Sequence, residues 1–123
     1  HTIKMREDFR PFAPAVLEEH YKEYFDTRLP SPYMSRICKV KTDKVPGITH
    51  VDGTARIQTV NKNDNEKFYK LLLEFWCITG IPMLLNTSFN CQEPIVETPK
   101  QAIRTFKRTA LDLLVIGDYI IRK

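Results

Sequence analysis

A short polar segment follows an apolar, strand-like run in the second half of the chain. Residues 81–85 are apolar, and after them come four small hydrogen-bonding side chains, Asn86, Thr87, Ser88 and Asn90. A buried strand that ends in such a cluster is a common way for an open α/β sheet to present a ligand site. An ordinary strand-to-loop turn has the same composition. The segment alone therefore leaves both interpretations open.

Three cations near the start of the chain are candidates to bind an anionic ligand. If residues 3–7 are extended, Lys4 and Arg6 lie on the same face of the strand, and Arg10 follows four residues later. Two neighbouring cations repel each other unless an anion lies between them, so the pair suits a phosphate or a carboxylate. The acidic residues between these cations could instead neutralise a solvent-exposed edge.

A fourth cation lies within a predicted strand over residues 54–60. The strand alternation places Thr54, Arg56 and Gln58 on one face, and the preceding Asp52-Gly53 dipeptide favours a tight turn. A stripe this polar does not suit a core. It is either a solvent face or one wall of an anion pocket, and the sequence alone does not separate the two.

Apolar periodicity and capping signals predict the fold that positions these residues. The class is α/β (α+β by stricter naming), an open twisted mixed sheet flanked by about three helices. Asn63 to Glu66 resembles a capping box, Gly80 ends the helix that follows, and Thr98 to Gln101 forms a second box. We read Trp76 as a core residue of the second helix. The predicted helices lie near residues 14–26, 64–79 and 98–109, and the predicted strands near 33–40, 48–51, 54–60, 82–87, 112–116 and 119–122.

Composition excludes several classes of protein. The 123 residues suit one domain, and no apolar run approaches the roughly 18 residues of a membrane span. Residues 1–12 do not resemble a signal peptide, and Cys38, Cys77 and Cys91 lack metal-type spacing. This pattern favours reduced thiols, most of them in the core, and a cytoplasmic location. No metal site is predicted, because Asp52 is the only acid beside the polar strand. The formal charge of +4 fits a small anionic ligand as easily as RNA.

Four blocks in sequence order together resemble a known family. Residues 10–17, 50–60, 85–90 and 93–96 look like the C-terminal part of carbamoyltransferases of the nodulation-protein NodU and cephalosporin-carbamoyltransferase CmcH type. The four blocks together are highly specific, although each alone is weak. The resemblance implies that residues 1–123 are one C-terminal domain and that a separate N-terminal, TsaD-like transfer domain is missing from this sequence. It also points to nodulation or antibiotic biosynthesis.

The resemblance carries expectations about activity as well. In this family the C-terminal region is similar to YrdC-like domains, whose KxR and SxN signatures are matched by Lys4-Met5-Arg6 and Ser88-Phe89-Asn90. The implied activity is binding of carbamoyl phosphate and ATP, with Mg²⁺ arriving on the ATP, to form carbamoyl-adenylate. The N-terminal domain then transfers the carbamoyl group to a hydroxyl. The implied catalytic residues are Lys4, Arg10 and Ser88, and Arg6, Arg56 and Asn90 complete the binding set.

Two alternatives remain open at this stage. A YrdC-like module can bind RNA, although the absence of interleaved aromatic residues disfavours that function here. Its candidate surfaces are the basic helix face of Arg104, Lys107 and Arg108 and the lysine loop of Lys39, Lys41 and Lys44. A docking domain with a degenerate site is the other alternative, and an exposed apolar patch near residues 111–121 would support it. Under the enzyme hypothesis, the isolated chain is expected to be weakly active or inactive.

Overall fold

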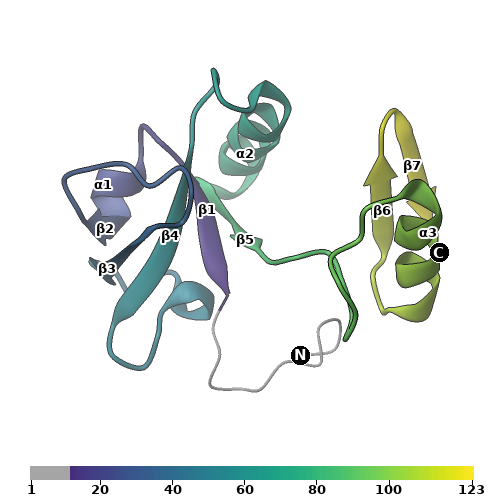
Figure 1. The fold of residues 1–123 in the computed structure, drawn as a ribbon. Helices are drawn as coiled ribbons and strands as arrows, with labels where there is room; N and C mark the ends of the chain where they lie inside the picture. The colour runs from purple at the N-terminus through teal and green to yellow at the C-terminus, as the bar shows by residue number, and fades with distance from the viewer. Residues whose placement is uncertain (1–11) are drawn as a thin grey trace. The chain divides into compact units, whose positions relative to one another are not determined.

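The structure, a computed structural model, describes residues 12–123. These residues form two compact units, which Figure 1 shows in the purple-to-green and the green-to-yellow parts of the ribbon. Residues 12–87 form the first, called here the sheet unit, and residues 88–123 form the second, called the hairpin unit. The single domain predicted for residues 1–123 stays a prediction.

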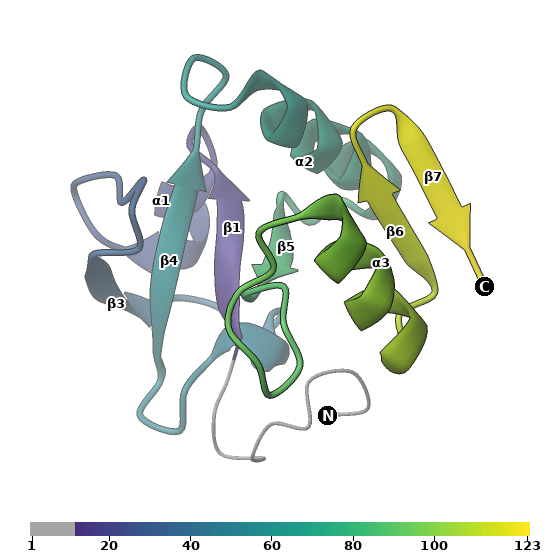
Figure 2. The same cartoon turned by 45° about the vertical axis from the view of Figure 1, so that its right-hand side comes forward.

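The sheet unit is built on a five-stranded mixed sheet of order β2-β3-β4-β1-β5. The first strand of the described residues, β1, lies between two strands that come much later in the sequence (Figure 2). It pairs in parallel with β4 and antiparallel with β5. The strands are β1 Ala13–Leu17, β2 Phe25–Asp26, β3 Arg36–Val40, β4 Thr54–Val60 and β5 Met83–Asn86.

Three helical segments accompany this sheet: α1 Tyr21–Tyr24, the 3-10 turn η1 Pro46–Ile48, and α2 Glu66–Thr79. Helix α2 begins at the N-cap Asn65, whose side chain accepts a hydrogen bond from the Phe68 amide, and it ends at the left-handed Gly80 with φ 72°. The Gly80 prediction is confirmed. The capping box predicted at Asn63 is wrong by two residues.

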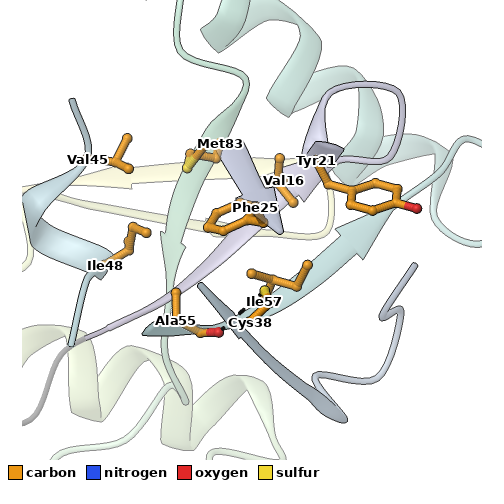
Figure 3. Packing of buried hydrophobic residues seen from close by; sticks show 9 residues of the cluster. All are labelled: Val16, Tyr21, Phe25, Cys38, Val45, Ile48, Ala55, Ile57 and Met83. Atoms are coloured by element: carbon orange, nitrogen blue, oxygen red, sulfur yellow. Dashed lines mark hydrogen bonds between the residues drawn. The ribbon is translucent and has the colours of Figure 1, made fainter. Parts of the chain in front are cut away.

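Each face of the sheet carries a buried apolar cluster. One face carries a cluster of nine buried residues, with Phe25 near its middle in Figure 3. The other face carries Ala15, Leu17 and Val60, which cluster with Leu72 of α2, and the partly buried Trp76 packs against this cluster. The His20 ring lies 4.2 Å from the Trp76 ring, so both residues serve packing. The nine residues of the first cluster are Val16, Tyr21, Phe25, Cys38, Val45, Ile48, Ala55, Ile57 and Met83.

The hairpin unit consists of α3 Pro99–Arg108 and the antiparallel pair β6 Leu113–Ile116 and β7 Tyr119–Arg122. The capping box predicted at Thr98 and Gln101 is confirmed in both directions. Gly117, with φ 57°, makes the turn between the two strands. Helix α3 packs on one face of the hairpin through Ala102, Phe106 and Leu114.

The predicted α/β class and mixed sheet are confirmed, and three of the element predictions need correction. The helix predicted over residues 14–26 is wrong, because this stretch contains strand β1, a four-residue helix and β2. Pro14 is tolerated in β1 because the parallel register with β4 begins one residue later, at Ala15.

The strand predicted over 48–51 is also wrong, since η1 and a turn at 51–53 occupy this region. The strand predicted over 33–40 begins only at Arg36, because a turn precedes it in which the Met34 amide bonds to the Ser31 carbonyl at 3.3 Å.

The remaining sequence predictions concern thiols, membranes and metals. All three cysteines are free, but only Cys38 is buried and Cys77 is exposed, so the prediction that most thiols are core residues is wrong. No helix within residues 12–123 is long and apolar enough to cross a membrane. The same residues contain no group of three or more metal-ligating side chains.

Candidate functional site

The six predicted site residues fall into three groups. Lys4, Arg6 and Arg10 lie outside the described residues. Arg56 lies on β4 of the sheet unit, whereas Ser88 and Asn90 lie in the loop that opens the hairpin unit. The predicted convergence of all six side chains on one anion therefore stays a prediction.

The predicted polar face of β4 is present in the sheet unit. Arg56 is exposed, while its neighbours Ala55 and Ile57 are fully buried on the opposite face. Gln58 lies on the same face as Arg56, two residues further along the strand. Arg56 is thus a solvent-accessible cation on a rigid strand of the sheet, which is a suitable position for binding an anion.

An amide pair extends this polar face across β1. The Asn86 Nδ2 atom donates a hydrogen bond of 2.6 Å to the Gln58 Oε1 atom, and Gln58 Nε2 donates to the Pro32 carbonyl at 3.3 Å. In the register of β1, Ala15 is opposite Gln58 and Ala13 is opposite Asn86. Because alanine carries only a methyl group, the two longer side chains can meet over the intervening strand. The bond fixes the end of β5, from which the chain continues toward Ser88.

The turn before β4 has a structural role. The carboxylate of Asp52 accepts hydrogen bonds from the Thr54 amide at 3.0 Å and from the Thr54 hydroxyl at 2.7 Å. These bonds lower the pKa of Asp52. The predicted tight turn is confirmed, with Gly53 at φ 77° and its amide bonded to the His50 carbonyl at 2.9 Å.

In the hairpin unit, Ser88 and Asn90 lie together in one turn. The Ser88 hydroxyl donates to the Asn90 Oδ1 atom at 2.7 Å, and the Asn90 Nδ2 atom donates to the Glu93 carbonyl at 2.6 Å. The Val96 amide donates to the Phe89 carbonyl at 3.0 Å and closes the loop behind the turn. A hydroxyl and an amide held side by side are the kind of groups that orient a bound oxyanion.

Glu93 connects this loop to helix α3. Its Oε1 atom accepts a hydrogen bond of 2.6 Å from the Thr105 hydroxyl, and its Oε2 atom lies 3.7 Å from the Arg104 guanidinium. Arg104 is exposed and its pairing with this acid is weak, so the basic face predicted on this helix stays a prediction. Glu93 lies in the family block of residues 93–96, but no sequence signal indicates a role for it. A pocket of about 440 Å³ adjoins these groups and is lined by Glu93, Pro94, Ile95, Val96, Glu97, Gln101, Arg104 and Thr105.

The predicted family can be tested by comparing the chain with known proteins. The family described as "Carbamoyltransferase C-terminus" matches residues 1–123, which is the whole chain. Nodulation protein NolNO of Sinorhizobium fredii is 47% identical to the chain, over 98% of this chain and 19% of that protein. Nodulation protein NolO of Bradyrhizobium diazoefficiens is 45% identical, over 99% of this chain and 24% of that protein.

A third relative, Nodulation protein U of Sinorhizobium fredii, is 45% identical, over 73% of this chain and 17% of that protein. The chain thus spans about a fifth of the length of these relatives. The family resemblance inferred from the four sequence blocks is confirmed. On the strength of a match over its full length, the chain belongs to the carbamoyltransferase family, of which it is the C-terminal region.

Proposed function

We propose that this chain binds a carbamoyl donor and ATP and forms carbamoyl-adenylate, which a separate N-terminal domain transfers to a hydroxyl group. The observation that carries the proposal is the turn of Ser88 and Asn90, whose hydroxyl and amide are bonded side by side in a chain that matches the carbamoyltransferase family throughout.

The proposed reaction brings two anions together, so it requires cations in the site. Hydrolysis of carbamoyl phosphate gives carbamate and phosphate, and a carbamate oxygen then attacks the α-phosphorus of ATP, with pyrophosphate as the leaving group. Carbamate and ATP are both anions, so their approach in a site with little water is strongly opposed. Lys4, Arg6 and Arg10 would screen this repulsion, and Arg56 would complete the set of cations. Mg²⁺ would arrive with the nucleotide, since Asp52 is occupied by its bonds to Thr54.

Ser88 and Asn90 would orient the anion during this step. Neither residue acts as a nucleophile in the proposal, because the carbamate oxygen itself forms the new bond to the α-phosphorus of ATP as pyrophosphate leaves. Catalysis would consist of positioning and of electrostatic stabilisation, which is the usual pattern in phosphoryl and nucleotidyl transfer.

The experiment uses the full-length protein that contains this chain and measures ATP–pyrophosphate exchange that depends on carbamoyl phosphate. Titration calorimetry on the same protein gives the affinities for ATP and carbamoyl phosphate. The variants are Lys4→Ala, Arg56→Ala and Ser88→Ala. Loss of a charge-assisted contact is worth about 1.5–3 kcal/mol, so Arg56→Ala should weaken binding by roughly 10- to 150-fold.

Arg36 provides the matched control for Arg56. It is an exposed arginine on the neighbouring strand β3, and it pairs with Ile57 in the ladder, so it lies on the opposite face of the sheet from Arg56. Arg36→Ala should bind as the wild type does. Wild-type affinities in all three test variants, or equal losses in Arg36→Ala and Arg56→Ala, would contradict the proposed site.

The docking alternative is favoured by one observation in the hairpin unit. Leu113, Val115 and Ile120 lie on the face of the hairpin that is opposite to α3, and their side chains are 42%, 61% and 62% exposed. We propose that the remainder of the full-length polypeptide covers this face, a role that is compatible with catalysis. When the remainder of the polypeptide is produced separately, Val115→Asp should abolish its co-purification with this chain, whereas Leu71→Asp on α2, exposed to 56%, should not.

A further inference from the structure

Glu93 makes two contacts that point in different directions. Its backbone carbonyl accepts a hydrogen bond of 2.6 Å from the Asn90 side-chain amide, inside the loop. Its carboxylate accepts a hydrogen bond of 2.6 Å from the Thr105 hydroxyl, on helix α3. One residue therefore joins the turn that carries Ser88 and Asn90 to a regular element of the hairpin unit.

The helix side of this connection is well defined. Thr105 is 2% exposed and lies beside the buried Phe106 of α3, so its position is set by the packing of the helix on the hairpin. A threonine hydroxyl inside a helix commonly bonds back to the carbonyl one turn earlier. The Thr105 hydroxyl instead donates to a carboxylate, and hydrogen bonds to ionised groups are the stronger kind.

In the loop, the position of Glu93 determines where the Asn90 and Ser88 side chains lie. The Asn90 amide group is oriented by the Glu93 carbonyl, and the Asn90 oxygen in turn accepts from the Ser88 hydroxyl at 2.7 Å. If the Glu93 carboxylate is released from α3, its carbonyl is free to move, and the acceptor of the Ser88 hydroxyl moves with it. An error of about 1 Å in the placement of such groups can reduce a rate by about 100-fold.

We infer that Glu93 and Thr105 are positioning residues, which hold the Ser88–Asn90 turn in its working geometry by tying it to helix α3. The inference rests on the proposed function for its kinetic consequence. The connection itself is a property of the hairpin unit and can be measured without activity.

The first arm of the test measures hydrogen–deuterium exchange in the full-length protein. Thr105→Val removes the hydroxyl at nearly constant volume, and Thr105→Ser restores it. Exchange in the segment 88–97, which includes the bonded Val96 amide, should be about 10-fold faster in Thr105→Val and in Glu93→Ala than in the wild type. Exchange in Thr105→Ser should be that of the wild type. Exchange in α2 of the sheet unit should stay unchanged in all variants and shows that each protein is folded.

The second arm measures pyrophosphate exchange with the same proteins. Thr105→Val and Glu93→Ala should lower kcat by roughly 10- to 100-fold with little change in KM for ATP, and Thr105→Ser should recover most of the rate. Arg104→Ala serves as the control, because this exposed partner lies 3.7 Å from Glu93, so its ion pair contributes little and activity should stay within about two-fold.

The two arms separate the inference from the function on which it rests. An inactive wild-type protein refutes the proposed function, and the deuterium exchange of segment 88–97 then decides the positioning role alone. Wild-type exchange in both Thr105→Val and Glu93→Ala overturns the inference. It is also overturned if Thr105→Ser and Thr105→Val lose the same activity, because the hydroxyl then has no part in positioning.

Discussion

The amide pair that spans β1 can be tested by a double-mutant cycle. The perturbations are Gln58→Ala, Asn86→Ala and the two together. The bond at issue runs from Asn86 Nδ2 to Gln58 Oε1 over 2.6 Å, in a partly buried setting. Because Gln58 also donates to the Pro32 carbonyl, its single substitution removes two contacts, and only the cycle isolates the bond between the two amides.

The expected magnitude follows from the neutrality and partial burial of both groups. A neutral hydrogen bond contributes about 0.5–1.5 kcal/mol net, and a partner left unsatisfied adds to the cost of each single substitution. Each single variant should therefore lose about 1–2 kcal/mol of unfolding free energy, and the coupling energy should be about 1 kcal/mol. At a urea dependence of about 1–2 kcal/mol per M, a loss of 1 kcal/mol moves the midpoint by roughly 0.5–1 M.

The assay is urea unfolding followed by tryptophan fluorescence. Trp76 is the only tryptophan in the sequence and lies on α2, so the signal reports on the sheet unit. Asn86→Ala combined with Thr27→Ala provides the control cycle, since the Thr27 hydroxyl donates to the Leu29 carbonyl just after β2, at the opposite edge of the sheet from β5. That control pair should be additive. A coupling energy below about 0.3 kcal/mol for Gln58 and Asn86 would refute the bond, and with it the fixed end of β5.

Three further predictions concern stability. Leu72→Ala should lose about 2–5 kcal/mol of unfolding free energy because Leu72 is fully buried, whereas Leu71→Ala, at 56% exposure on the same helix, should lose less than about 1 kcal/mol; urea unfolding compares them. Thr98→Ala should cost about 1 kcal/mol by removing the cap of α3, measurable as faster amide exchange in that helix. Burial, aided by Asp26, raises the pKa of the Cys38 thiol. The folded state therefore retains a proton that the unfolded chain loses above about pH 8.5, and the urea midpoint should fall above that pH in the wild type more than in Cys38→Ala.

The sequence predicted best the elements whose signals are local. Strand β4 was predicted with its observed bounds, because its faces alternate and Gly53 marks the turn before it. Helix α3 was predicted within one residue at each end, because the Thr98 capping box and a proline define its start. In both elements, the residues that bond to one another and define where the element begins lie within four positions along the chain.

Strand β1 could not be predicted from such signals. Its residues from Pro14 to Leu17 are buried on both sides of the sheet, so the period-two alternation of a half-exposed strand is missing. Together with Tyr21, Tyr24 and Phe25, these residues also match helical spacing. Residues 14–17 form a strand and not a helix because they pair with strands β4 and β5, whose residues lie far away in the sequence.

Long sequence separation also explains which contacts of the candidate site the sequence did not predict. Ser88 and Asn90 are two residues apart, and the family signature identified them together. The contact of Glu93 with Thr105 spans 12 positions, and that of Gln58 with Asn86 spans 28. Neither spacing belongs to a motif or to a single element, so only the folded chain brings these side chains together.

The central place of β1 in the sheet has a consequence for how the sheet unit forms. Ala15 is opposite Gln58, 43 positions later, and opposite Leu84, 69 positions later. During synthesis, β4 follows this strand only after a long intervening segment, and β5 follows only when almost the entire unit has been made, so the apolar side chains of β1 remain exposed to water until then. Strand pairings between residues far apart in the sequence slow folding and prolong the exposure of apolar surface that is prone to aggregation. Producing the protein at low temperature, or with a chaperone that binds residues 13–17, should therefore raise the yield of folded protein. Substitutions that stabilise one of the helices should raise that yield less.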